Sequence, residues 1–212
     1  MMNVTAIVGI AFWLTVTATF AKEATFNQAS VHELAFDGCH FKFSDPYHAR
    51  ISTDMESATH SASYVANINP KARHPFETWI HFRCENPATS KTYLESASIK
   101  LTPHGWILDT SKEDPNFPSP RTTLYALYGK SWHGGGTTQD ETDGDEDKRT
   151  RAFNFCIPHN KLALCGSIQS VSYLSYPDES TLPQVIRLLE SIEFIDRPPA
   201  PHTDSVSPSS SQ

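Results

Sequence analysis

Four cysteines, at positions 39, 84, 156 and 165, are the residues of this 212-residue chain whose types and spacing most constrain its chemistry. Zinc sites usually contain close Cys–Cys or Cys–His pairs, and the sequence has no C-x-x-C motif. An even number of cysteines in an exported chain favours disulfides. We therefore expect two disulfides, and the alternative is a pair of reactive thiols.

The segment FCIPHNKLALCG, residues 155–166, predicts how one disulfide forms. If Asn160-Lys161 is the two-residue turn of a β-hairpin, Cys156 lies opposite Cys165 at a non-hydrogen-bonded pair. The Cα atoms of such a pair are close enough for a disulfide. Pro158 also falls at a non-hydrogen-bonded position, where its missing N–H removes no ladder bond. The proline and the cysteines therefore agree on one register.

The second disulfide follows by elimination and joins Cys39 to Cys84. Because a longer closed loop restricts the unfolded chain more, this bridge should contribute about 4 kcal/mol to stability, against about 2.7 kcal/mol for the hairpin bridge. Both would act as structural staples.

Other patterns that could do chemistry are incomplete. His133-Gly134-Gly135-Gly136 is similar to the oxyanion-hole loop of esterases, but the chain has no G-x-S-x-G nucleophile motif. Asp143, Asp145 and Asp147 alternate as in a calcium loop, yet Lys148 stands at the position of the invariant glycine. We predict no catalytic residue, no cofactor and no metal site. Weak calcium binding is one alternative, and a hydrolase built without a recognisable motif is another.

The N-terminal segment predicts export. Residues 1–21 carry no charged side chain and end in Thr19-Phe20-Ala21, which is typical of a signal peptide cleaved before Lys22. The alternative is an uncleaved anchor. We expect a periplasmic or secreted protein with no stable membrane insertion after cleavage. The formal net charge of −7 argues against nucleic acid and anionic membranes as partners.

The mature chain has about 190 residues, which is enough for one domain with a sizeable core. We expect a single domain over residues 22–196, followed by a Pro- and Ser-rich disordered tail over residues 197–212. Residues 133–151 contain three consecutive glycines and then six carboxylates, which predicts a long mobile loop.

The hydrophobic pattern predicts an α+β fold, mainly an antiparallel sheet with one or two covering helices, braced by the two disulfides. Thr181 is expected to cap a helix with Gln184 completing a capping box, and a strand follows at residues 193–195. Residues 54–65 are expected to form a further helix. The expected strands are one or two within 31–43, then 76–84, 98–101, 105–109, 122–128, the 155–166 hairpin and 167–176.

Two short segments resemble a known family. LPQVIRLLESIEFIDRP, residues 182–198, resembles the closing helix and strand of Mog1/PsbP-like domains and of periplasmic immunity proteins against type VI secretion lipases. GCHFKFSDP, residues 38–46, is similar to their early Cys-strand-Pro segment. Those proteins usually contain two such domains, and this chain has room for one. The resemblance implies a non-enzymatic inhibitor that occludes a toxin. It is carried here by Cys39, Phe41, Phe43, Pro46, Leu188, Leu189, Ser191, Ile192, Phe194, Arg197 and Pro198.

We therefore expect an exported domain that binds another protein, and its most specific form is an immunity protein against a secreted toxin. The alternatives are a periplasmic hydrolase and a small-ligand or calcium-binding module. Binding energy at protein interfaces concentrates in aromatic and Arg anchors, and acidic loops steer basic partners. The predicted partner-binding residues are Trp132, Asp140, Glu141, Asp143, Asp145, Glu146 and Asp147.

Overall fold

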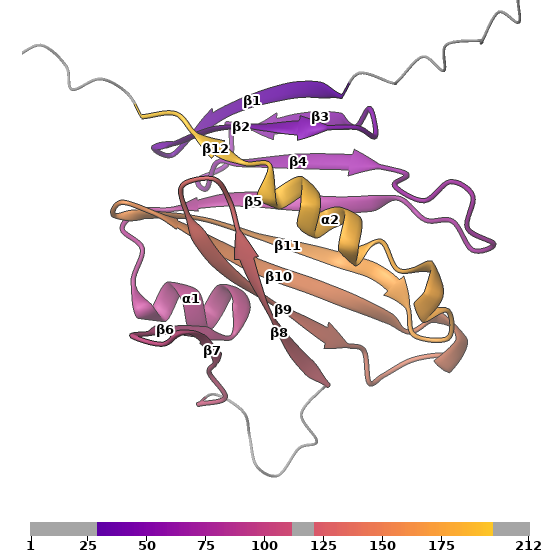
Figure 1. Cartoon of the computed structure of the whole chain (residues 1–212). Helices are drawn as coiled ribbons and strands as arrows, with labels where there is room; N and C mark the ends of the chain where they lie inside the picture. Colours follow the sequence, from indigo (N-terminus) through magenta and orange to yellow (C-terminus); the bar gives the residue numbers. More distant parts are fainter. Residues whose placement is uncertain (1–28, 112–120, 197–212) are drawn as a thin grey trace, which may run out of the picture.

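The computed structural model describes residues 29–111 and 121–196, which form a mostly antiparallel β structure with two α-helices (Figure 1). The predicted signal peptide, the cleavage site before Lys22 and the predicted tail lie outside the described residues. The elements are β1 (Ser30–Phe36), β2 (Cys39–Asp45), β3 (Arg50–Asp54), β4 (Ser61–Ala66), β5 (Thr78–Glu85), α1 (Ser90–Ala97), β6 (Ile99–Thr102), β7 (Gly105–Leu108), β8 (Thr122–Tyr128), β9 (His133–Asp140), the 3-10 turn η1 (Glu146–Lys148), β10 (Thr150–His159), β11 (Leu162–Tyr173), the 3-10 turn η2 (Pro177–Glu179), α2 (Leu182–Glu190) and β12 (Glu193–Phe194).

Seven strands form the main sheet, in the order β3-β4-β5-β11-β10-β9-β8, and each neighbouring pair is antiparallel. A smaller sheet has the order β1-β2-β12, and β6 pairs with β7 in a separate hairpin. The smaller sheet and α2 cover one face of the main sheet, which we call the inner face (Figure 1). The opposite face is called the outer face.

Aromatic residues fill the core between the two sheets. Phe41 and Phe43 alternate with half-buried residues along β2, so both point toward the main sheet. Their rings lie 5.7 Å and 6.1 Å from the ring of Phe82 on β5. On α2, Leu182, Val185, Leu188 and Leu189 recur at helical spacing and are buried against the same core.

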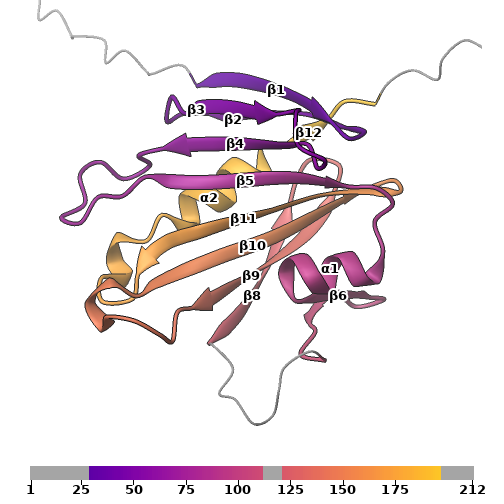
Figure 2. The ribbon, with the colours of Figure 1, turned by 180° about the vertical axis from the view of Figure 1, so that it is seen from behind.

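The outer face is covered only in part. α1 and the β6-β7 hairpin lie over the β8 to β11 side of the sheet, whereas β4 and β5 are uncovered in the view from behind (Figure 2). Gly135 on β9 makes this cover possible, because a Cβ atom there would lie 3.0 Å from Trp106 Cγ and 3.1 Å from Ile99 Cδ1. Gly135 therefore lets the hairpin approach the sheet backbone closely.

The predicted hairpin and both disulfides are confirmed. Cys156 pairs with Cys165 in the ladder between β10 and β11, and the turn residue Asn160 has φ of 55°. The structure contains the Cys156–Cys165 bridge and the bridge from Cys39 to Cys84, which links β2 of the smaller sheet to β5 of the main sheet. The predicted α+β class with a mainly antiparallel sheet is also confirmed.

The prediction of one long loop over residues 133–151 is wrong. Residues 133–140 form β9, which pairs with β8 on one side and β10 on the other. A glycine-rich sequence has low β propensity, but at these positions the strand can form only because the residues have no side chain. A Cβ atom at Gly136 would lie 2.5 Å from Phe153 Cζ and 2.7 Å from Asn154 O. Only residues 141–149 connect the two strands.

Two helix predictions also need correction. Residues 54–65 do not form a helix, because Asp54 Oδ1 accepts hydrogen bonds from the backbone N–H groups of Glu56 and Ser57 and turns the chain between β3 and β4. The helix α2 is present, but Thr181 makes no capping box. Its hydroxyl donates to the carbonyl of Val171, and the neighbouring Ser180 hydroxyl accepts from Leu182 N.

Candidate binding surfaces

Trp132, the predicted aromatic anchor, lies in the core. Its side chain is 6% exposed, and its Nε1 donates a hydrogen bond of 2.8 Å to the carbonyl of Ile192. Gly129 leaves room for the ring, since a Cβ atom there would overlap it. The expectation that Trp132 contacts a partner is therefore wrong, because a side chain held inside the domain cannot anchor a second protein.

Three of the six predicted acidic residues are paired with a basic side chain in or beside the loop. The carboxylate of Asp140 forms a two-pronged ion pair with Arg151 at the base of the loop. Further along, Asp145 pairs with Lys148 at 3.3 Å. Glu146 pairs with Arg149 at 3.7 Å. These three pairs compensate half of the six carboxylates, so the segment keeps a net negative charge.

The remaining three predicted acidic residues have different environments. Glu141 closes the loop: its Oε2 accepts a hydrogen bond of 2.8 Å from Thr150 N. Asp143 and Asp147 are exposed. Over residues 29–111 and 121–196, no three His, Cys, Asp or Glu side chains converge as a metal site would require.

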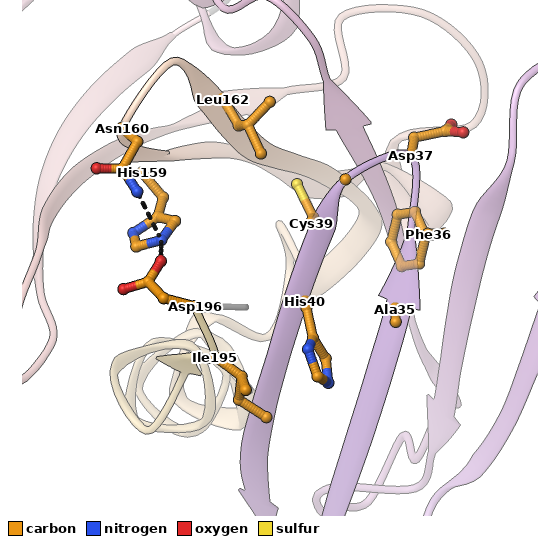
Figure 3. Close-up of a pocket in the computed structure, with 11 residues that line it drawn as sticks. Ala35, Phe36, Asp37, Cys39, His40, His159, Asn160, Leu162, Ile195 and Asp196 are labelled. Carbon is orange, nitrogen blue, oxygen red and sulfur yellow. Dashed lines mark hydrogen bonds and ion pairs between the residues drawn. The ribbon is translucent and has the colours of Figure 1, made fainter. Parts of the chain in front are cut away.

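A hollow of about 280 Å³ lies between two hairpin turns and the chain after β12 (Figure 3). On one side, His159 Nε2 lies 2.8 Å from Asp196 Oδ1, and the His159 ring stacks on Phe194 with centroids 4.1 Å apart. On the other side, His40 Nε2 lies 2.6 Å from Glu33 Oε1. His159 and Asp196 could polarise a water molecule, so this is the place where a motif-free hydrolase site would be sought.

The hollow does not contain the rest of a nucleophilic site. Its described lining includes no serine or threonine, and the sulfur of Cys39 is in a disulfide. Elsewhere, Ser30, His32 and Asp45 are in contact, but His32 Nε2 faces both the Ser30 hydroxyl and the Asp45 carboxylate. A catalytic triad uses the two ring nitrogens separately, so this group cannot relay a proton in that way.

A large exposed aromatic side chain of the main sheet, Trp79, lies on the uncovered outer face. The side chain of Trp79 is 58% exposed although β5 is the third strand from the sheet edge. In the register of the sheet, Trp79 is opposite Val65 of β4, and Val65 is opposite Arg50 of β3. His81 and Arg83 follow Trp79 on the same face of β5. We call these five residues the Trp79 surface.

The electrostatics of the Trp79 surface are mild. Burial and the nearby Arg83 lower the pKa of His81, so its imidazole is neutral at neutral pH. Arg50 reaches Glu77 at 3.0 Å, and Arg83 reaches Glu85 at 4.0 Å. The surface therefore combines one large aromatic ring with two compensated guanidinium groups.

Sequence reasoning missed Trp79 although a signal was present. Side chains in the segment 76–84 alternate between two faces of a strand. One face carries Phe76, Thr78, Ile80, Phe82 and Cys84. The other face carries Trp79 together with the polar residues Glu77, His81 and Arg83. A tryptophan on the charged face of a strand that buries only its other face is a candidate for an exposed binding residue.

Comparison with models of known protein families gives no match, and no curated protein matches the sequence. In the described part of the chain, no helix is both long and apolar enough to cross a membrane.

Proposed function

We propose that this protein is an exported domain that binds another protein through the Trp79 surface, and that it neutralises a toxic secreted effector in the periplasm. The two disulfides support the exported part of the proposal, because such bridges persist in oxidising compartments. The resemblance of residues 38–46 and 182–198 to immunity proteins supports the inhibitory role. The partner is a folded protein rather than nucleic acid, given the acidic net charge.

One observation carries the proposal: Trp79 stands exposed in the interior of a seven-stranded sheet. A strand that is third from the edge normally buries its large apolar side chains. Tryptophan and arginine are the residues most enriched at interface hot spots, and here they share one face. The pairing of Arg50 and Arg83 with nearby carboxylates leaves the aromatic ring as the main source of binding energy.

The shape of this face favours a protein partner over a small ligand. Small molecules are bound in concave sites that bury most of their surface. The side chains of the Trp79 surface instead project from the uncovered face of a sheet. An inhibitor needs only to cover the target, so a broad face with one central anchor is sufficient. The neutral His81 and the hydroxyls of Ser63 and Ser167 beside it in the register offer hydrogen bonds around the anchor.

A toxin-protection assay tests the proposal. Effectors encoded beside the gene for this protein are directed to the periplasm of a test strain, with and without the protein, and growth and direct binding are measured. We expect protection by the natural protein. Trp79→Ala should weaken effector binding by about 30-fold, the loss of one hot spot, without unfolding the domain.

Tyr128→Ala is the matched control, because Tyr128 is an aromatic residue of similar exposure, 60% against 58%, on a distant strand. It should leave effector binding unchanged. Equal affinity of a folded Trp79→Ala variant would remove this surface from consideration. Turnover of an ester, glycan or peptide that is lost in His159→Ala would instead assign the protein to the hydrolases.

A further inference from the structure

The two ends of the main sheet are protected to different degrees. At one end β3 has five residues and carries Arg50 and Asp54 at its termini. Charged residues on a short edge strand discourage pairing with another chain. At the other end β8 has seven residues, TTLYALY, with no charge and no proline. The strand β8 itself therefore carries no charge or proline that would discourage pairing with another chain.

The backbone groups of β8 that face outward can be assigned from its hydrogen bonds to β9. Gly129 N donates to Trp132 O at 3.0 Å, and Asp140 N donates to Arg121 O at 3.3 Å. Because hydrogen bonding alternates along an antiparallel pair, the N–H and C=O groups of Leu124 and Ala126 point away from β9. Within the described parts of the chain these groups have no hydrogen-bond partner.

Exposed apolar side chains lie beside this edge. Tyr128 is 60% exposed at the end of β8, and Leu101 and Ile107 on the neighbouring hairpin are 54% and 46% exposed. A hollow of about 450 Å³ separates the hairpin from β8 and is lined by Leu101, Trp106 and Tyr128 among others. A partner strand on β8 would bring further chain over these side chains.

We propose that β8 pairs antiparallel with β8 of a second copy of this chain, about a twofold axis at Tyr125. In this register Leu124 is opposite Ala126 of the second copy, so a large side chain meets a small one at both symmetric pairs. Tyr125 meets its own equivalent at a non-hydrogen-bonded position, and aromatic pairs there are stabilising. The two main sheets then form one continuous sheet.

Charge complementarity favours a second copy over a foreign strand. Glu190 of α2 accepts a hydrogen bond of 3.2 Å from Tyr128 N, so its carboxylate lies at one end of the edge. Arg121 precedes the other end. The twofold pairing brings Arg121 of one copy beside Glu190 of the other, and it does so twice. A foreign strand would have to supply both opposite charges itself.

The solution mass of the whole protein tests the pairing. Light scattering after size exclusion, over a concentration series, should show a dimer for the natural protein. Ala126→Pro removes an outward N–H that has no ladder partner, so the domain should fold and run as a monomer. Ala126→Val introduces a side chain of about the size of proline but keeps the backbone N–H, so this variant should remain a dimer. Far-ultraviolet circular dichroism checks that both variants are folded.

Reversing the charges tests the register. Arg121→Glu and Glu190→Arg should each weaken the dimer, and the double variant should restore it, because each copy then offers the opposite charge to its twin. A natural protein that is monomeric at all concentrations, an Ala126→Pro variant that still dimerises, or a double variant no better than the single ones would each overturn the proposal. The toxin-protection assay relies on Trp79, on another strand, so the two proposals fail independently.

Discussion

At the scale of single residues, Asp45 has the most demanding environment. Its carboxylate is fully buried and accepts hydrogen bonds from Ala49 N at 2.7 Å, Tyr47 N at 2.8 Å, Tyr64 Oη at 2.9 Å and His32 Nε2 at 3.2 Å. Burial raises the pKa of Asp45, but these hydrogen bonds outweigh burial and hold the pKa below its ordinary value. The carboxylate thus fixes the end of β2 against β4.

Asp45→Asn should lower the free energy of unfolding by about 3 kcal/mol at neutral pH, because the amide offers a single acceptor to several donors. A lowered folded pKa means that the stabilisation by Asp45 is present above the unfolded pKa of about 4 and is lost as pH falls through the folded value. Urea unfolding across this range should therefore show a flatter acid limb for the variant. Asp143→Asn, in the exposed part of the acidic loop, is the control and should change little.

Trp132 should behave as a core residue. Trp132→Ala removes a buried indole and leaves the carbonyl of Ile192 without its donor, so a loss of about 3–5 kcal/mol is expected. Trp79→Ala, on the exposed face, should stay within about 0.5 kcal/mol of the natural protein. Guanidinium unfolding of both variants measures the contrast, and similar losses for the two would contradict the burial assigned here.

At the scale of elements, β9 and the acidic loop have to be treated separately. The loop closes where Glu141 N donates to Thr150 O at 3.0 Å, with the Asp140–Arg151 ion pair just inside. Residues 142–148 lie beyond this closure and are exposed. Replacing them by a short Gly-Ser turn should leave the melting temperature within a few degrees.

Replacing residues 133–151 as a whole should instead prevent folding, because β9 connects β8 to the rest of the sheet. Thermal unfolding followed by circular dichroism distinguishes the two replacements. A large loss of stability from the shorter replacement would mean that the loop packs on the domain or holds a structural ion.

At the scale of the whole molecule, the two disulfides connect different parts of the fold and should contribute differently to stability. Cys39–Cys84 closes 45 residues and ties the smaller sheet to the main sheet, whereas Cys156–Cys165 closes 9 residues within one hairpin. Loop entropy then predicts that replacing both members of the first pair by alanine costs about 4 kcal/mol, and of the second about 2.7 kcal/mol. The unfolding free energies of the two double variants measure whether loss of the Cys39–Cys84 bridge costs more. Equal losses would contradict this prediction.

Elements with a local signal were predictable from the sequence. The 155–166 hairpin followed from a turn, a proline and two cysteines that are consistent with one register, and helix α2 followed from the helical spacing of the apolar residues Leu182, Val185, Ile186, Leu189 and Ile192. The strand β9 was missed because three glycines give no local β signal. Its reason to be a strand lies in Phe153 and Trp106, residues distant in sequence that pack where side chains would be.

The sequence by itself determined the cysteine pairing, the hairpin register and the mainly antiparallel α+β class, because each depends on alternation or spacing along a short stretch. Only the tertiary structure decided which aromatic residues are exposed. Trp132 directly precedes the segment predicted as a mobile loop and yet is buried against Ile192, while Trp79 lies inside a regular strand and yet is exposed. The reason is that burial depends on which elements, distant in sequence, cover a face of the sheet. On the outer face, α1 and the β6-β7 hairpin cover the strands from β8 to β11 and leave β5 uncovered.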